Sequence, residues 1–348
     1  MRKGKWHKVV VAVVLFTLLL GGLAVASGQK DGTSAKKGPI TIGLSHINFT
    51  HEFFRGWISE QEKCDAYFGT KTIHKSCESN IDKQLSDIES FIAMKADVIM
   101  INPIDVVGVK PAVKAALDAG IPTMSTANVI EVAGNVNALL PEYQLFSSMA
   151  SILAALLNYE GNVLWLGGQV GNWASDIRQK GFMETMAKYP KIKVLGWAPG
   201  EWDGNKAVSI VQGWMTTYDK IDAIGCMDDG MGLPAWEAIK NAGRDKDILF
   251  FSAYGGQPGY DKVASGEWVG GTALTPQMFA WFCTQTAYRL AKGEKLKDVF
   301  MDVPLVLTQK TIDTCKERKM PGIAKVLWVN PKEAAVVGSK GQEYFGKK

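Results

Sequence analysis

Short apolar runs alternate with longer amphipathic segments along most of this chain, and this alternation constrains the fold more than any other feature. The apolar runs include Ile40–Ser45, Val98–Asn102, Ile121–Ser125, Val163–Gly168, Ile192–Trp197, Ile221–Met227, Ile248–Ala253 and Trp268–Leu274. The amphipathic segments are Phe53–Tyr67, Ile81–Lys95, Val107–Asp118, Glu142–Asn158, Ser175–Tyr189, Asn205–Tyr218, Gly232–Ala242 and Met278–Ala291. A strand followed by a helix, repeated, predicts βαβ units and an α/β fold whose parallel sheets are buried on both faces.

The number of these units leaves two architectures open. Eight or more strand–helix units either close into one barrel or divide into two doubly wound sheets, and periodicity does not choose between them. A weak internal repeat favours two lobes, because one series runs to about Pro141 and a second begins at Val163. The length of 348 residues also suits about two domains.

The N-terminus has the pattern of a secretory signal peptide. Four basic residues precede the apolar run Val9–Leu20, and the small residues of Ala24-Val25-Ala26 follow it. Twelve helical residues span about 18 Å, short of a hydrocarbon core of about 30 Å, so we expect cleavage after Ala26 and export across the membrane rather than a membrane anchor. Without those four charges the 39 Lys and Arg become 35, equal to the 35 Asp and Glu, so the remaining chain is neutral. Residues 27–39 form a polar leader.

Export determines how the five cysteines are interpreted, because compartments beyond the membrane permit disulfides. Cys64 with Cys77, and Cys283 with Cys315, are candidate bridges, although the sequence does not fix the connectivity. Cys226 lies inside an apolar run and is interpreted as a buried thiol. No CxxC or HxxxH spacing occurs, so we expect neither a metal site nor another cofactor.

Several candidate binding residues follow strands of the first half of the chain. Phe53 and Phe54 follow the first strand, where they either offer a flat face to a ring or pack in the core. Asn102 is held at a strand end by the proline after it, and its amide either binds a hydroxylated ligand or caps a turn. Asn128, beyond the next strand, has the same two interpretations.

The second half offers three more candidates. Arg178 is expected in the first turn of a helix, where the macrodipole disfavours it, so it is either retained for its planar five-donor fork or lies on the surface. Trp202 lies in a strand-to-helix connection, where it either stacks on a ligand ring or packs between lobes. Of the next acidic pair, Asp229 is expected to cap the helix, and Asp228 to face a cleft and accept hydroxyl protons.

Hydrolytic chemistry and a phosphate-binding role for the glycine-rich loop lack support in the sequence. Gly167-Gly168-Gln169-Val170-Gly171 matches neither GxGxxG nor GxxxxGK[ST], and no GxSxG elbow occurs. The three histidines beyond the predicted signal peptide all fall between Ile40 and Ser76. We therefore expect a protein that is not an enzyme, and its neutral charge gives no nucleic-acid footprint.

Residues 40 to about 310 contain, in this order, Phe53-Phe54, Ile101-Asn102-Pro103, Ala119-Gly120-Ile121-Pro122, Arg178-Gln179-Lys180-Gly181-Phe182, Trp202-Asp203 and Asp228-Asp229-Gly230-Met231. Through these motifs the chain resembles the type I periplasmic sugar-binding proteins, the ribose-binding-protein-like solute-binding components of ABC importers. It implies two doubly wound parallel-sheet lobes joined by a multi-crossover hinge, with residues 40–141 and 275–304 in one lobe and 142–274 and 305–348 in the other. It also implies a monomer that closes around a ligand and delivers it to an inner-membrane ABC permease.

The resemblance also assigns roles to the candidate residues. Phe53 or Phe54 and Trp202 would stack on the ligand ring. Asn102 and Asp228 would bind hydroxyls, Arg178 would make a forked contact, and His51 occupies a position where relatives often have a polar contact residue.

The chain departs from the sugar-binding pattern at three positions. Ala127-Asn128 replaces an acid and an arginine, Tyr254 stands near a usual aspartate, and Leu274 replaces a polar residue. We still expect Asn128 and Tyr254 to contact the ligand. The ligand is then a sugar, a sugar derivative or a polyol, or alternatively a non-sugar ring compound. The alternative role is that of a ligand sensor docking onto a chemoreceptor or histidine kinase.

Overall fold

The structure is a computed structural model that describes residues 38–253, 256–272, 274–303, 305–318 and 320, and the backbone of 328–329. From Pro39 onward the described residues belong to one compact unit. The predicted signal peptide, most of the polar leader, Tyr254, and residues 321–327 and 330–348 of the C-terminal extension lie outside the described residues. Within the described part, no helix has the length and apolar character needed to cross a membrane.

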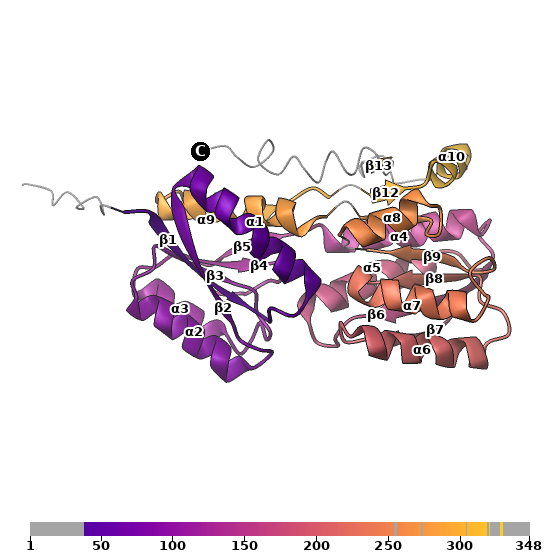
Figure 1. The fold of residues 1–348 in the computed structure, drawn as a ribbon, viewed down its shortest axis with the longest axis horizontal. Coiled ribbons are helices and arrows are strands. Elements are labelled where there is room, and N and C mark those ends of the chain that lie inside the picture. Colours follow the sequence, from indigo (N-terminus) through magenta and orange to yellow (C-terminus); the bar gives the residue numbers. More distant parts are fainter. Residues whose placement is uncertain are drawn as a thin grey trace, which may run out of the picture. The chain divides into compact units, whose positions relative to one another are not determined.

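The first sheet contains only parallel pairs in the described part of the chain. Its strands are β1 (Ile40–His46), β2 (Thr70–Ser76), β3 (Val98–Ile101), β4 (Thr123–Thr126), β5 (Val136–Leu139) and β11 (Val299–Phe300), in the order β11-β5-β4-β3-β1-β2. Its helices are α1 (Glu52–Phe68), α2 (Ile81–Ala93), α3 (Lys110–Asp118) and α9 (Pro276–Ala291). Helix α1 packs on α9 and α2 packs on α3 (Figure 1). We call this sheet and its helices the N-terminal lobe.

The second sheet is parallel except for one antiparallel pair. Its strands are β6 (Gly161–Gly167), β7 (Ile192–Pro199), β8 (Ala223–Cys226), β9 (Leu249–Ser252), β10 (Gly270–Thr272), β12 (Leu305–Leu307) and β13 (Trp328–Val329), in the order β13-β12-β10-β9-β8-β6-β7. Its helices are α4 (Glu142–Leu156), α5 (Trp173–Met186), α6 (Gly204–Thr217), α7 (Asp229–Asn241), α8 (Gln257–Ala264) and α10 (Gln309–Glu317). Helices α4 and α5 pack together, as do α6 and α7. This sheet and its helices form the C-terminal lobe.

Two separate sheets exclude the single barrel and confirm the predicted two-lobed α/β fold. The chain passes from one sheet to the other after β5, after β10 and after β11, which are the crossovers of the predicted hinge. The residue ranges predicted for the lobes, 40–141 with 275–304 and 142–274 with 305–348, stay predictions.

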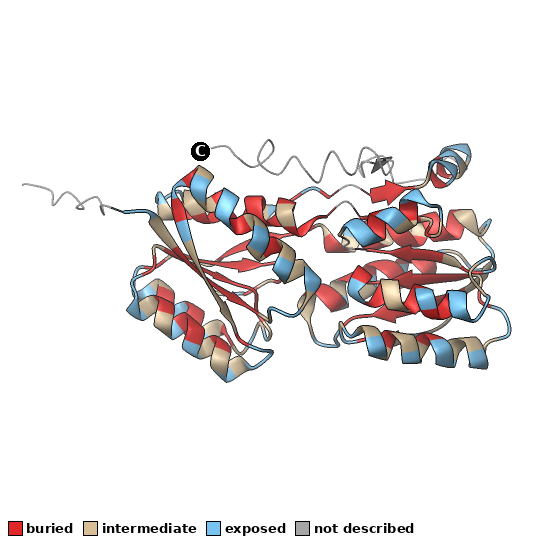
Figure 2. Cartoon of the chain, in the orientation of Figure 1, coloured by how far each residue is buried: buried red, intermediate tan, exposed pale blue. Residues whose placement is uncertain are grey.

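Burial follows from helices that cover the sheets. Every residue of β3, β4, β5 and β8 is buried, and exposed positions concentrate on the helices (Figure 2). Strand β2 was not among the apolar runs because it lies at a sheet edge: in its sequence TKTIHKS only Thr70 is buried. An edge strand needs no continuous apolar sequence, so hydrophobic runs alone do not predict it.

The cysteines do not form the predicted bridges. All five thiols are free and buried. Cys64 lies in α1, Cys283 in α9 and Cys315 in α10, while Cys77 follows β2 and donates a hydrogen bond to the carbonyl of Ile47. Burial raises the pKa of Cys64 to about 12 and that of Cys315 to about 11, so both are neutral thiols. The interpretation of Cys226 as a buried thiol is confirmed.

A buried and a half-buried histidine form a pair beneath the start of α1. His46, at the end of β1, has no exposed surface, and its Nε2 lies 2.9 Å from Nδ1 of His74 on the adjacent strand. The rings stack with centroids 5.2 Å apart. Burial lowers the pKa of His74 to about 4, and burial together with the charge of His74 lowers the pKa of His46 to about 3. Both imidazoles are therefore neutral at pH 7.

We expect this pair to destabilise the protein in mild acid. Histidines titrate near 6.5 in the unfolded chain, so below that pH the unfolded state binds more protons than the folded state. The stability present above pH 6.5 is lost progressively as the pH falls toward the lowered pKa values of about 4 and about 3. The loss is up to about 1.4 kcal/mol per pH unit for each histidine, and urea denaturation across this range measures it.

The variant His74→Gln removes one titrating group and keeps an amide beside His46. Over the same pH range its free energy of unfolding should fall less steeply than that of the wild type, with a slope smaller by about 1 kcal/mol per pH unit. His51→Gln is the matched control, because the pKa of His51 is raised and its removal should not lessen the acid loss. An unchanged slope in His74→Gln would contradict the assignment of this acid sensitivity to the pair.

Candidate functional site

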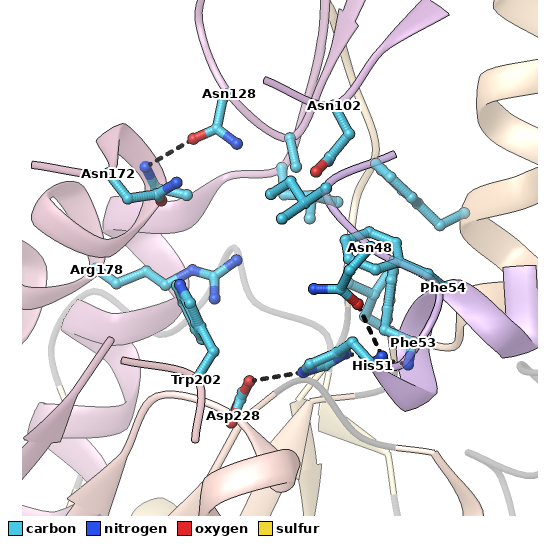
Figure 3. Close-up of a pocket in the computed structure, with 16 residues that line it drawn as sticks. Asn48, His51, Phe53, Phe54, Asn102, Asn128, Asn172, Arg178, Trp202 and Asp228 are labelled. Atoms are coloured by element: carbon cyan, nitrogen blue, oxygen red, sulfur yellow. Dashed lines mark hydrogen bonds and ion pairs between the residues drawn. The ribbon is translucent and has the colours of Figure 1, made fainter. Parts of the chain in front are cut away.

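A cavity of about 140 Å³ lies where strand ends and loops of both lobes meet (Figure 3). Its lining contains Ile47, Asn48, His51, Phe53, Phe54, Asn102, Ala127, Asn128, Leu140, Asn172, Ala174, Arg178, Trp202, Asp228, Leu274 and Phe279. Every predicted ligand-contacting residue that the structure describes is in this lining, and Tyr254 is outside the described residues. In open parallel sheets the carboxyl ends of strands are where ligands bind, and this position follows that rule.

The start of α1 supplies the aromatic wall of the N-terminal lobe. His51 is the N-cap of α1, and its Nδ1 accepts a hydrogen bond from the backbone N–H of Phe53 at 3.2 Å. Phe53 and Phe54 lie in the first turn, half-buried, with ring centroids 6.0 Å apart in an edge-to-face arrangement. They pack against the core and also line the cavity, so they are core residues in part, and their contact with a ligand ring stays a prediction.

Asn102 presents a buried acceptor at the end of β3. Its Nδ2 donates to the carbonyl and the hydroxyl of Thr126, at 3.3 and 3.2 Å. Its Oδ1 has no hydrogen-bond partner among the described residues, although Asn102 is only 5% exposed. A buried carbonyl oxygen without a partner costs free energy, and a hydroxyl in the cavity would satisfy it.

Asn128 joins the two walls of the cavity. The residue before it, Ala127, has a φ of 62°, which is uncommon for a residue other than glycine and turns the chain sharply after β4. The Oδ1 of Asn128 accepts a hydrogen bond from the backbone N–H of Ala174, at the start of α5 in the other lobe, at 3.2 Å. Asn128 therefore caps neighbouring backbone and lines the cavity.

Arg178 belongs to a buried ion pair, which corrects its predicted place in the first turn. Helix α5 begins at Trp173, two residues earlier than predicted, because Asn172 caps it, so Arg178 lies in the second turn. Its Nε and Nη2 donate to the two carboxylate oxygens of Glu142 at 2.9 and 2.8 Å. The Glu142 side chain is fully buried and that of Arg178 is 8% exposed. The surface interpretation of Arg178 is therefore wrong.

Trp202 lies beside this ion pair. It has a φ of 61° in the turn between β7 and α6, and its ring lies 5.6 Å from the guanidinium carbon of Arg178. A Cβ atom on Gly168 would lie 2.6 Å from the Trp202 indole, so only glycine leaves room for this ring. The glycine-rich sequence after β6 thus clears space for an aromatic side chain.

Asp228 caps α7, which corrects the prediction that Asp229 would do so. The Oδ1 of Asp228 accepts from the backbone N–H of Met231 at 2.9 Å, while Asp229 is the first helical residue and is buried. The Oδ2 of Asp228 lies 3.5 Å from Nε2 of His51 (Figure 3). One carboxylate therefore caps a helix and also meets an imidazole of the other lobe.

The charge state of His51 depends on this contact. Burial by itself lowers the pKa of His51, but the hydrogen bond and charge of Asp228, with the charge of Glu52, outweigh burial and the nearby Arg55. The pKa is raised as a result. Protonation of His51 therefore strengthens a contact between the two walls.

The sequence did not reveal several residues of the lining. Asn48 and Asn172 add two amides, and Asn172 could have been found as a helix cap after a glycine-rich turn. The remaining ones are apolar and carry no motif: Ile47, Leu140, Ala174 and Phe279. Leu274 and Ala127, noted in the sequence as departures, are also in the lining.

Comparisons with known proteins agree with this architecture. The model of the periplasmic binding protein domain matches residues 42–295. The xylitol-binding protein of Mycolicibacterium smegmatis is 28% identical over 85% of this chain and 85% of its own length, and the ribose import binding protein of Bacillus subtilis is 27% identical over 87% and 98%. The crystal structure of a Caulobacter myo-inositol binding protein superposes with a TM-score of 0.74 at 20% identity, over 83% of this chain and all of that one. The chain therefore belongs to the periplasmic binding protein domain family.

Proposed function

We propose that this protein is a periplasmic solute-binding protein that captures a sugar, a sugar derivative or a polyol in the cavity and delivers it to an ABC importer. The observation that carries this proposal is the pairing of aromatic rings with amide groups around one cavity between two lobes. Its relatives in M. smegmatis and B. subtilis are named for xylitol and ribose, which supports the same class of ligand here.

The lining matches the surface of a polyhydroxylated molecule. The rings of Phe53, Phe54 and Trp202 offer flat apolar faces to the C–H groups of a sugar or polyol. The Oδ1 of Asn102, which has no partner among the described residues, accepts a hydrogen bond from a ligand hydroxyl, and Asp228 and Arg178 supply charge-assisted hydrogen bonds. Tyr254, outside the described residues, stays in the proposal only as a prediction.

The same lining supports binding without catalysis. It contains no serine, threonine, cysteine or lysine among the described residues, so a side-chain nucleophile of those types is absent from it. Its histidine is occupied at both ring nitrogens, by the N–H of Phe53 and by Asp228. The proposal therefore includes no enzymatic activity, no cofactor and no nucleic-acid partner.

The proposed partners and location follow from the proposed role as a solute-binding protein. The protein acts as a monomer in the periplasm, after cleavage of the signal peptide following Ala26, and docks onto an inner-membrane permease. The alternative is a ligand sensor that docks onto a chemoreceptor or histidine kinase. Neighbouring genes separate these roles, since permease and ATPase genes favour uptake and a kinase gene favours sensing.

Thermal denaturation of residues 27–348 with a ligand panel tests the proposal. Sugars, polyols, sugar derivatives and small nitrogenous or aromatic ring compounds make up the panel. A ligand at about 1,000 times its Kd should add about 4 kcal/mol, which raises the Tm by at least a few degrees. Stabilisation by a non-sugar ring compound alone would redirect the ligand class, and recovery of a chemically changed ligand would contradict a role without catalysis.

Replacing Trp202 tests the aromatic wall. Trp202→Ala should weaken binding of the stabilising ligand by about 1 to 3 kcal/mol, because a stacking ring is lost. Trp197→Ala is the matched control, since Trp197 is 41% exposed on β7 and is not in the cavity lining. Isothermal titration calorimetry measures both, and equal affinities for the two variants would place the ligand elsewhere.

Ligand affinity should also depend on pH through His51. The pKa of His51 is raised where it meets Asp228, so the arrangement that joins the lobes binds a proton more strongly than one in which they separate. The contribution is complete below the ordinary pKa of 6.5 and is lost as the pH rises through the raised value. We expect the Kd for a neutral ligand to rise by roughly fivefold or less across this range. His51→Gln should bind with little dependence on pH, and a persisting dependence would contradict this origin.

A further inference from the structure

Each positively charged group in the cavity lining is paired with a carboxylate. Arg178 is held by both oxygens of Glu142, and His51 lies 3.5 Å from Asp228. Besides Arg178, His51 and Asp228, the described lining contains no ionisable side chain. With Glu142 directly behind Arg178, the charges sum to zero when His51 is protonated and to minus one when it is neutral.

Glu142 blocks one edge of the arginine fork. A carboxylate or phosphate ligand binds arginine best through two parallel N–H groups. In this protein Nε and Nη2, which form one such edge, donate to Glu142 at 2.9 and 2.8 Å. The guanidinium carbon also lies 5.5 Å from the ring of Phe146 and 5.6 Å from that of Trp202, which fixes the plane of the group.

The remaining polar side chains of the described lining carry no charge. Four asparagines, Asn48, Asn102, Asn128 and Asn172, supply the amide groups of the cavity. Amides donate to and accept from hydroxyl groups, but they do not compensate an ionised ligand. An anion in this cavity would lie close to Glu142 and Asp228, and the described lining holds no uncompensated cation to balance it. Such repulsion is one way in which binding sites reject unwanted ligands.

We propose that Glu142 is the specificity-determining residue that makes the cavity reject anionic ligands. Glu142 is absent from the cavity lining and acts by positioning and neutralising Arg178. This inference rests on the proposed function and narrows it, because the ligand is then an uncharged sugar or polyol rather than a sugar acid or sugar phosphate.

Matched neutral and acidic ligands test this inference on the exported protein. Isothermal titration calorimetry compares xylitol with D-xylonate and ribose with D-ribonate. The wild-type protein should bind a neutral member at least about 100-fold more tightly than its acid. Glu142→Gln should narrow this ratio at least about tenfold by gaining affinity for the acid, because the charge of Arg178 is released. A merely structural defect would lose affinity and would not create affinity for an acid.

Two variants serve as controls. Glu184→Gln removes a half-exposed carboxylate of the neighbouring helix α5 and should keep the wild-type ratio. The double variant Glu142→Gln/Arg178→Gln removes both charges of the pair and should gain no affinity for the acid.

The outcomes separate this inference from the proposed function. Wild-type protein that binds an acid as tightly as its neutral partner would overturn the role of Glu142 and leave a solute-binding protein in place. Folded Glu142→Gln with an unchanged ratio would overturn it as well, and if this variant does not fold, the wild-type ratio decides. A wild-type protein that binds no member of these pairs and none of the wider ligand panel would overturn the proposed function itself.

Discussion

Parallel strand pairing is the constraint on which the rest of this structure depends. A parallel sheet buried on both faces leaves its strand interiors no contact with solvent, as the fully buried β3, β4, β5 and β8 show. Polar groups that a ligand can reach then lie where the strands end. In both lobes such groups lie at the carboxyl ends of the strands, so that Asn102 after β3 and Asp228 after β8 line the same cavity. The aromatic side chains come from the helix starts and turns that follow these strands. The position of the cavity therefore follows from the sheet topology rather than from any single residue.

The buried ion pair gives this cavity its chemistry. Glu142 and Arg178 are both nearly inaccessible to solvent, and a single buried charge would be costly to leave alone. Glu142 begins α4 directly after the first crossover, and Arg178 is on α5, the helix packed against it. The pair therefore holds an arginine at the cavity without giving the cavity a net positive charge. A binding site for hydroxyl groups needs donors such as Arg178, and it does not need their charge.

Local patterns predicted the fold and much of the candidate site, and failed where partners are distant in sequence. Strand and helix alternation predicted an α/β fold with parallel sheets, while a weak internal repeat and the family resemblance favoured two lobes over one barrel. Strand-end positions identified Asn102, Trp202 and Asp228 as candidates. The partner of Arg178 lies 36 residues away, and no local pattern links the two. Helix α7 begins at Asp229, three residues before the predicted Gly232, and Asp228 rather than Asp229 caps it, because a helix boundary depends on which side chain reaches the free N–H groups. The cysteine bridges failed for a similar reason, since sequence separation says nothing of the direction in which each thiol points.

The contacts that already join the lobes determine which interactions a ligand must still supply. Asn128 meets the backbone N–H of Ala174, and His51 meets Asp228, so each wall already satisfies polar groups of the other. A ligand shifts a conformational equilibrium only by its differential affinity for the two states. Since protein groups make these contacts, the ligand contributes what they leave open, namely the Oδ1 of Asn102 and the aromatic faces. We therefore expect these open groups to recognise the hydroxyl and C–H groups of the ligand, while the contact of His51 with Asp228 joins the two walls and the Glu142–Arg178 pair keeps the cavity free of net positive charge.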